Sequence, residues 1–472
     1  MRNGPRRPAI GTLLGVVVAA FVAASAAARQ DAPPWAAQVD RVFETWNRAD
    51  SPGCALGVFR DGHLAYARGY GIADVEQNVR IAPDTVFYVG SLSKQFTAMA
   101  AALAIEQGRL SAEDPVRRYL PELPAYADAI RVRHLIHHTS GLRDYNTLLS
   151  IAGRRGDEAY DNRTVLRMTA RQRDLNFRPG TEYLYSNTGY TLLATVVERA
   201  VGTRFAEYAD TQIFAPLGMT ATHYGVDVSR LVPRRASAYA RGADGKLRLD
   251  TPRNERAGAG GVFTTVRDLL RWDENFYDAR VGGRALIDRV QTPGSLGDGS
   301  PITYAWGLQL GTYRGLRIVE HGGSLGGYRA HLTRFPEPHV SVAILCNLGS
   351  IAPAGLARQV ADVVLSDRLK EPAPSTPRPS ARPAAPPAAA AASDPQALTG
   401  VYYSDEIDAT FTVAVEAGRL VLRREHDEGP APLEALGDGR YRGLSMTIHF
   451  EPSALVVDAG RVRGIRFARK PL

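Results

Sequence analysis

The pattern of hydrophobic and polar residues predicts that the folded chain begins with a helix and a hairpin. Residues 35–49 carry apolar side chains at helical spacing. Residues 54–59 and 63–69 are strand-like runs, and the turn signal Arg60-Asp61-Gly62 separates them. A helix followed by a hairpin indicates a mixed α/β fold.

Later segments predict more helices and a second group of strands. A helix is expected over residues 87–107, because its apolar residues recur at helical spacing and Gly108 supplies a stop. Three strand-like runs come late, at residues 316–320, 329–335 and 340–347. We therefore expect an antiparallel sheet built from the early hairpin and this late trio, with a helical region between them. The other expected helices cover residues 189–201, 266–276 and 353–369.

Composition marks a boundary after the last of these helices. Residues 371–393 are rich in Pro and Ala and lack large apolar side chains, which is typical of an exposed linker. Residues 394–472 hold short alternating runs between Gly and Asp turns, which predicts a small β-sheet or barrel module. Because such a linker transmits little packing energy, this module is predicted to be separable from the larger domain, residues 29–370.

The first residues have the order of a secretory signal peptide. Arginines at positions 2, 6 and 7 precede an apolar run over residues 10–24, and small residues follow to position 28. The alternative is a permanent N-terminal anchor, but the run is shorter than the roughly 20 residues of a spanning helix. We expect cleavage of residues 1–28, no membrane span in the mature protein, and a periplasmic or secreted location.

Charge and composition exclude several functions. The chain has 472 residues, 44% of them hydrophobic, and a formal net charge of +8, which fits a folded globular protein. The basic residues are dispersed without a run of five or six like charges, so nucleic acid is not an expected partner. Only four of the 57 basic residues are lysines, at positions 94, 246, 370 and 470. Few side chains can therefore supply a deprotonated amine.

Ser91 and Lys94 form the first candidate catalytic pair. Three residues apart at the start of a predicted helix, they lie on one face, about one turn from each other. A lysine in a desolvated cleft can lose its proton and activate the serine hydroxyl. The alternative is an N-cap serine beside a solvated lysine.

Two further segments carry polar groups suited to substrate binding. Tyr185 and Asn187 lie in a loop before a helix, where a tyrosine can relay a proton and an asparagine amide can hold a carbonyl. Tyr185 could instead be a packing residue. His321 is followed by two glycines and Ser324, which leaves a strand edge approachable by a ligand or forms a simple turn.

In this order the three motifs resemble the serine β-lactamase and penicillin-binding protein superfamily. The sequences Ser91-x-x-Lys94, Tyr185-Ser186-Asn187 and His321-Gly322-Gly323 match its three motifs, in the branch of class C β-lactamases, DD-peptidases, D-aminopeptidases and related esterases. The resemblance covers residues 35–369 and includes the flanks LIHHTSGL, PGTEYLYSN and AGGVFTTVRDLLRW. It implies a β-lactamase-like α/β fold, an antiparallel sheet flanked by helices with a helical region.

The resemblance also implies a role for each motif residue. Ser91 would be the acylated nucleophile, Lys94 its basic partner and Tyr185 the proton relay. Asn187 would contact the substrate amide, and the N–H groups of Ser91 and Ser324 would hold the oxyanion. The full predicted site comprises catalytic Ser91, Lys94 and Tyr185 with substrate-binding Asn187, His321, Gly323 and Ser324.

Position 321 departs from the pattern of many members, which have a lysine there. A histidine is largely neutral near pH 7.5, so the cleft is expected to lack a fixed cation for a substrate carboxylate. Neutral esters and amides should then be preferred. Any preference for carboxylate substrates should rise as the pH falls through about 6.5.

Three nearby histidines do not predict a metal site. His134, His137 and His138 have helical spacing, but they come from one helix without an evident carboxylate partner, and the same run is structural in the family. No metal or cofactor is expected.

The two cysteines, Cys54 and Cys346, lie in strands that the family fold places side by side. A disulfide between them is therefore geometrically possible, and two free buried thiols are the alternative.

The sequence thus predicts a secreted serine hydrolase that acts through an acyl-enzyme on a small-molecule or peptide substrate: D-amino-acid peptides, cell-wall fragments or small esters. The rival is a non-catalytic penicillin-binding-type sensor or binding protein that is acylated without turnover. The sequence predicts neither the oligomeric state nor the role of the β module.

Overall fold

The computed structural model describes residues 1, 4, 32–154, 160–252, 255–371, 394–425, 427, 429–437 and 439–471. The predicted signal peptide, apart from Met1 and Gly4, and the predicted linker, apart from Glu371, lie outside the described residues. Among the residues that are described, no helix combines the length and the apolar character needed to cross a membrane.

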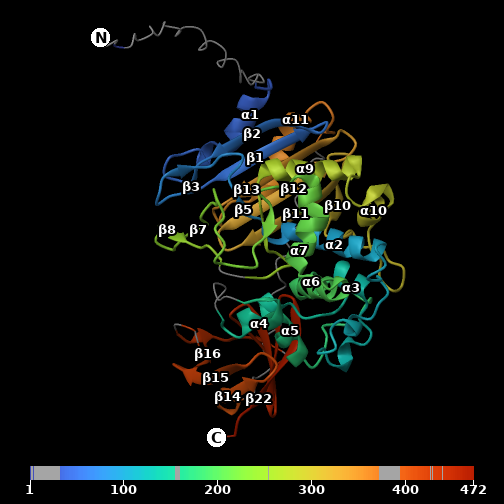
Figure 1. The fold of residues 1–472 in the computed structure, drawn as a ribbon. Coiled ribbons are helices and arrows are strands. Elements are labelled where there is room, and N and C mark those ends of the chain that lie inside the picture. Colours follow the sequence, from blue (N-terminus) through green and yellow to red (C-terminus); the bar gives the residue numbers. More distant parts are fainter. Residues whose placement is uncertain are drawn as a thin grey trace.

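In the described chain, six strands form the central antiparallel sheet, in the order β10-β11-β12-β13-β1-β2 (Figure 1). As predicted, the early hairpin of β1 (Cys54–Arg60) and β2 (His63–Tyr70) lies beside the late strands. The tight turn at Asp61 and Gly62 has the positive φ angles that such hairpins require. The late strands are β10 (Gln309–Tyr313), β11 (Leu316–Leu325), β12 (Tyr328–Phe335) and β13 (Val340–Cys346). The sequence missed β10, whose largely exposed side chains give no hydrophobic alternation.

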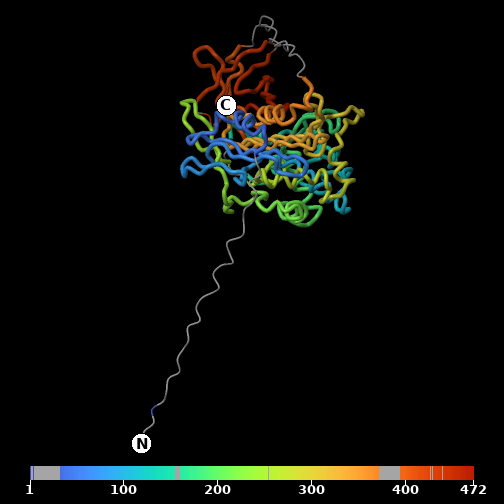
Figure 2. Tube along the Cα trace, turned by 90° about the horizontal axis from the view of Figure 1, so that it is seen from above, coloured from blue at the N-terminus to red at the C-terminus, as the bar shows by residue number. Residues whose placement is uncertain are grey.

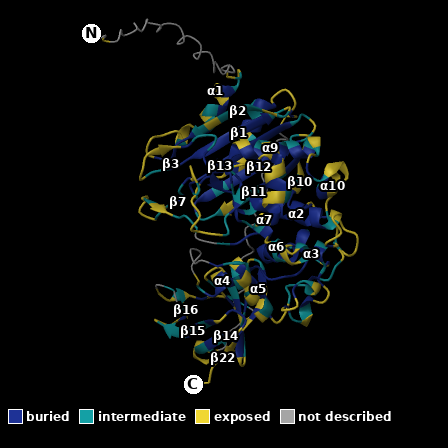
Figure 3. Cartoon of the chain, in the orientation of Figure 1, coloured by how far each residue is buried: buried dark blue, intermediate teal, exposed yellow. Residues whose placement is uncertain are grey.

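Helices cover both faces of this sheet. On one face α1 (Ala36–Val42) and α11 (Pro353–Val364) bury Val39, Leu356 and Val360 against β1 and β13. On the other face lie α9 (Val266–Asp278) and α2 (Lys94–Glu106), which packs on α6 (Asn187–Val201). Figure 3 shows α2 largely in the colour of buried residues, which agrees with its Ala-rich sequence and close packing. Predicted helices 87–107 and 353–369 are shorter than expected, because residues 87–93 form strand β5 (Phe87–Tyr88) and a 3₁₀ turn, and α11 ends at Val364.

Cys54 and Cys346 form a disulfide between the adjacent strands β1 and β13, where they are directly opposite each other. Because both cysteines of the chain are used, thiol titration of the denatured, unreduced protein is expected to find no free thiol. Reduction should then release both. Two titratable thiols before reduction would contradict the bond.

The C-terminal module is an antiparallel sheet of nine strands within residues 394–471, in the order β17-β16-β15-β14-β22-β21-β20-β19-β18. The terminal strands of this order, β17 (Ala431–Pro432) and β18 (Glu434–Gly437), are separated in the chain by Leu433 alone. The sheet must therefore curl until its ends meet, which gives the barrel-like form that the short alternating runs predicted. The remaining strands are β14 (Gly400–Ser404), β15 (Ala409–Glu416), β16 (Arg419–Arg424), β19 (Arg440–Gly443), β20 (Met446–Glu451), β21 (Ala454–Ala459) and β22 (Val462–Arg469).

The module shares its core with the larger domain, which differs from the separable module that the sequence predicted. Helices α4 (Tyr145–Ile151) and α5 (Asn162–Arg171) lie between the module and the rest of the chain (Figure 1). Leu148, Ile151 and Ala152 belong to the module's own hydrophobic cluster. Figure 2 shows the module, in red, beside the larger domain when the molecule is viewed from above. Removing the module would expose these apolar side chains of α4 to water.

Candidate active site

Ser91 lies in the 3₁₀ turn η2 (Gly90–Ser93), directly before α2 and against strand β11. Two glycines allow this close approach. Gly90 has a φ of +53°, and a Cβ there would lie 2.5 Å from the Ser324 nitrogen. A Cβ on Gly323 would lie 1.9 Å from the Val89 carbonyl oxygen and 2.9 Å from the Ser91 nitrogen. The backbone amides of Ser91 and Ser324 are thereby brought to the same place, where both N–H groups can hold one developing oxyanion.

Lys94 is fully buried beneath Ser91, and its amine has three neighbours. The Nζ atom lies 3.1 Å from Ser91 Oγ, 2.9 Å from Asn187 Oδ1 and 2.7 Å from the Ala259 carbonyl oxygen. The oxygens of Asn187 and Ala259 can only accept hydrogen bonds, so they take the two N–H groups of a neutral amine. The lone pair then faces the Ser91 hydroxyl, which is the arrangement that a general base requires.

The surroundings of Lys94 favour this neutral form. Burial lowers the pKa of Lys94 well below its ordinary value, and the negative charge of Asp144 opposes the shift. The positive charges of Arg461 and Arg256 lower this pKa further. Lys94 is therefore suited to accept a proton from Ser91 near neutral pH.

Asn187 is oriented by Asp144, a residue that the sequence analysis did not select. Oδ2 of the buried Asp144 accepts hydrogen bonds from the Asn187 backbone nitrogen at 2.7 Å and from Asn187 Nδ2 at 2.9 Å. Because the amide nitrogen faces this carboxylate, the amide oxygen must face Lys94. Asp144 also caps helix α4 through the backbone nitrogens of Asn146 and Thr147. An aspartate directly before a helical run is the one sequence signal that marks it.

Tyr185 covers Lys94 from the cleft side, with Lys94 Nζ 4.8 Å from the centre of its ring. Burial raises the pKa of Tyr185 well above its ordinary value, and a hydrogen bond with the Ser91 side chain opposes that rise. The phenol therefore carries its proton at neutral pH and can pass one to a leaving group. His138 packs against the Tyr185 ring with 4.2 Å between ring centres, which fixes the ring's position.

His321 is buried, and both of its ring nitrogens have contacts inside the protein. Nδ1 lies 2.6 Å from the Gly322 carbonyl oxygen, which can only accept, so Nδ1 must carry the hydrogen. Nε2 lies 3.0 Å from the Tyr304 hydroxyl, which can donate to it. Burial lowers the pKa of His321 to about 3. The ring is a neutral structural group that supports strand β11 beside the cleft.

This geometry changes the expected pH dependence of substrate choice. Because the pKa of His321 lies near 3 and not near 6.5, its charge should stay constant from about pH 8 to about pH 5. The ratio of kcat/KM for a carboxylate substrate to that for its amide should not rise across this range on account of His321. A His321→Gln variant should show the same pH profile of this ratio as the wild type. A rise centred near pH 6.5 that His321→Gln removes would contradict the assignment.

The predicted residues open onto one cleft of about 680 Å³. Ser91, Tyr185, Asn187 and the strand β11 line it, with two arginines, Arg329 and Arg461. The expectation that this cleft lacks a fixed cation is therefore wrong. Arg329 pairs with Ser324 on the neighbouring strand β12 and was not selected from the sequence, and Arg461 could not be placed from the sequence because it comes from the distant C-terminal module. All predicted site residues except the buried Lys94 line this cleft: Ser91, Tyr185, Asn187, His321, Gly323 and Ser324.

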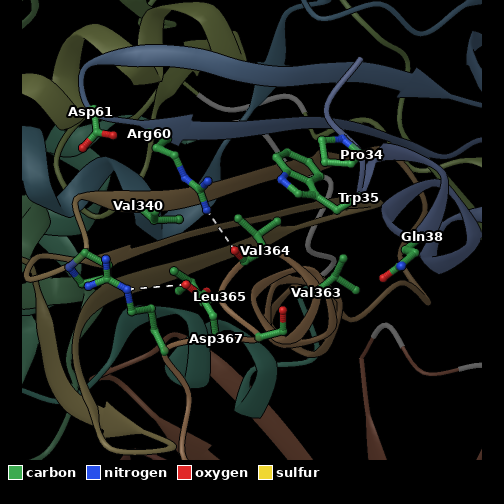
Figure 4. A pocket seen from close by; sticks show the side chains of 13 residues that line it. Pro34, Trp35, Gln38, Arg60, Asp61, Val340, Val363, Val364, Leu365 and Asp367 are labelled. Atoms are coloured by element: carbon green, nitrogen blue, oxygen red, sulfur yellow. Dashed lines mark hydrogen bonds and ion pairs between the residues drawn. The ribbon is translucent and has the colours of Figure 1, made fainter. Parts of the chain in front are cut away.

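A second pocket, of about 520 Å³, lies at the end of the central sheet where β1 finishes and β13 begins (Figure 4). Arg60 and Val340, which face each other at the ends of β1 and β13, line it together with the end of α11. It shares no lining residue with the cleft at Ser91, and Arg60 donates a hydrogen bond to the Val364 carbonyl. We therefore place the candidate chemistry at Ser91.

The three histidines that could suggest a metal have separate structural contacts. His134 Nδ1 accepts from the Arg131 backbone nitrogen and His138 Nδ1 from that of Ser186, each at 3.1 Å, while His137 packs on Trp306. In the described part of the chain, no group of three or more His, Cys, Asp or Glu side chains is arranged to hold a metal ion.

Comparison with known proteins defines the class. The family model described as Beta-lactamase matches residues 37–365, and the chain belongs to this family. A D-aminopeptidase from Gluconobacter oxydans is 30% identical over 335 residues, which cover 71% of this chain and 62% of that protein. Penicillin-binding protein 4* from Bacillus subtilis is 32% identical over 323 residues, 65% of this chain and 70% of the relative.

Solved structures show the same fold. The octameric penicillin-binding protein homologue from Pyrococcus abyssi has a TM-score of 0.62 at 22% identity and covers 92% of this chain and 99% of its own. The D-amino acid amidase from Ochrobactrum anthropi SV3 has a TM-score of 0.59 at 21% identity and covers 71% of this chain and 99% of its own. Because the first structure covers 92% of this chain, its match must extend into part of the C-terminal module.

Proposed function

We propose that this protein is a secreted or periplasmic serine hydrolase that forms an acyl-enzyme at Ser91 and cleaves amide bonds of D-amino-acid amides or short D-peptides. The observation that carries this proposal is the position of the Lys94 amine, which lies 3.1 Å from Ser91 Oγ and within hydrogen-bond distance of two acceptors, Asn187 Oδ1 and the Ala259 carbonyl oxygen. The names of its relatives, a D-aminopeptidase and a penicillin-binding protein, support the substrate class. The disulfide supports an oxidising compartment.

The residues perform the reaction in two stages. Lys94 accepts the Ser91 hydroxyl proton as the oxygen attacks the substrate carbonyl, and the N–H groups of Ser91 and Ser324 stabilise the oxyanion. The protonated Tyr185 donates a proton to the leaving amine as the C–N bond breaks, which leaves an ester on Ser91. Tyr185 is reprotonated from Lys94, so no net proton is gained or lost. Water then attacks the ester and releases the acid.

A paired-substrate screen tests this proposal. The protein is assayed on D- and L-alanine p-nitroanilide, on p-nitrophenyl esters of both enantiomers and on nitrocefin. We expect the D-amides to be hydrolysed and the L-amides to be poor substrates. Equal turnover of both enantiomers, or turnover of nitrocefin alone, would contradict the proposed substrate class.

A further inference from the structure

Arg461 occupies the tip of a tight hairpin at the mouth of the cleft. Strands β21 and β22 pair through Ala459 and Val462, so Gly460 and Arg461 form a two-residue turn, with Gly460 at a φ of +47°. The Arg461 guanidinium lies 4.7 Å from the centre of the Tyr185 ring and lines the same cleft as Ser91. An arginine of the appended module thus sits beside the group that donates a proton to the leaving amine.

The larger domain holds this turn in place through the turn's backbone. Asn176 Nδ2 donates to the Arg461 carbonyl at 2.9 Å, and Asn176 Oδ1 accepts from the Arg463 nitrogen at 2.8 Å. Arg143 donates to the carbonyls of Arg463 and Gly464 at 3.0 and 3.1 Å. Because Asn176 and Arg143 hold the backbone of this turn, the Arg461 side chain enters the cleft from a defined position.

The Arg461 side chain keeps capacity for a ligand. It is 42% exposed, and its Nη1 lies 3.7 Å from Asp144 Oδ2, too long for a direct hydrogen bond. The same oxygen of Asp144 already accepts two hydrogen bonds from Asn187. Among the described contacts the Arg461 guanidinium donates no hydrogen bond, and its ion pair with Asp144 is long. A planar guanidinium in this position is suited to bind a carboxylate in a bidentate manner.

We propose that Arg461 binds the carboxylate of the leaving group, so that the preferred substrates are D-peptides whose leaving residue ends in a free carboxylate. This inference rests on the proposed function, because Tyr185 defines the leaving-group side of Ser91. His321 is neutral and fully hydrogen-bonded, so it does not supply this cation. Arg329, the other arginine of the cleft, already donates through Nη1 to the carbonyl oxygens of Gly326 and Tyr328. The C-terminal module is therefore a part of the substrate-binding site.

The test uses protection of Ser91 against a fluorophosphonate label, a readout that does not need turnover. N-acetyl-D-alanyl-D-alanine and its C-terminal amide serve as competitors for wild type, Arg461→Met, Arg461→Lys and the control Arg463→Gln. Arg463 is a matched control because it lies in the same hairpin and its side chain pairs with Glu182.

For the wild type and for Arg463→Gln, the carboxylate peptide should protect at about ten- to hundredfold lower concentration than the amide. Arg461→Met should abolish this difference, and Arg461→Lys should keep part of it. Equal protection by both peptides in the wild type, or an unchanged ratio in Arg461→Met, would overturn the inference. Protection without hydrolysis of either peptide would support the inference and count against the proposed function, whereas hydrolysis without discrimination would do the reverse.

Discussion

Lys94→Arg is expected to reduce acylation of Ser91 by about 10²- to 10⁴-fold while the protein stays folded. Arginine keeps the positive charge, but it does not lose its proton in proteins and so cannot accept one from Ser91. The buried Lys94 amine contacts Ser91, Asn187 and Ala259, and no other described amine lies near Ser91. This substitution therefore tests directly whether Lys94 is the base. The measurement is the rate of fluorophosphonate labelling, with circular dichroism as a check of the fold.

Ser91→Ala is the companion variant, and it should remove labelling altogether. Asn187→Asp is not a suitable control, since Asn187 contacts both Lys94 and Asp144. Ser93→Ala is a better control for the effect of a nearby substitution on folding. Among the described contacts the Ser93 hydroxyl bonds only to backbone groups: it donates to the Gly90 carbonyl oxygen and accepts from the Val262 nitrogen. Turnover by Lys94→Arg at the wild-type rate would contradict the role of Lys94 as the base.

Glu406→Ala should destabilise the protein by about 3–5 kcal/mol, because it leaves a buried guanidinium without its carboxylate. Arg143 and Glu406 join the larger domain to the module through a 2.8 Å ion pair, with each side chain 4% exposed. Glu406 also accepts a hydrogen bond from the Arg173 backbone nitrogen at 2.9 Å. Because Arg143 holds the turn that carries Arg461, the variant should also slow Ser91 labelling. The free energy of unfolding in urea measures the first effect.

The neighbouring residue supplies the control for this variant. Asp405 forms an exposed ion pair with Arg173 across the same interface, and its side chain is 58% exposed. Asp405→Ala should cost less than about 1 kcal/mol, because exposed ion pairs contribute little. The double variant Arg143→Met/Glu406→Leu should recover part of the lost stability, since it leaves no unpaired buried charge. Equal destabilisation by Glu406→Ala and Asp405→Ala would contradict the proposed importance of the buried pair.

Local patterns predicted much of the fold and the motif residues. The spacing of Ser91 and Lys94 places both on one turn whatever the tertiary structure, and alternating apolar residues fixed the early hairpin and the late strands. The resemblance then indicated how Tyr185 and Asn187 would join them. These predictions concern segments whose structure is set mainly by nearby residues or by the family pattern.

Groups that act across the fold could not be predicted in this way. Arg461 is one of many arginines in the sequence, and only the packing of the module on α4 brings it to the cleft. The low pKa of His321 arises from burial, which its sequence neighbours do not reveal. The linker composition suggested an independent module. The sequence did not show the interface, because Leu148 and Ile151 look like ordinary core residues of a helix in the larger domain, whereas they pack in the cluster of the module.

The most direct test of the central claim is time-resolved intact-mass spectrometry of the protein mixed with a D-alanine ester. The account predicts an acyl adduct that peptide mapping places on Ser91 and that disappears as the free acid accumulates. No adduct on Ser91, or an adduct on another residue, would contradict the proposed nucleophile. An adduct on Ser91 that persists after the ester is removed would instead show a penicillin-binding sensor and contradict hydrolysis.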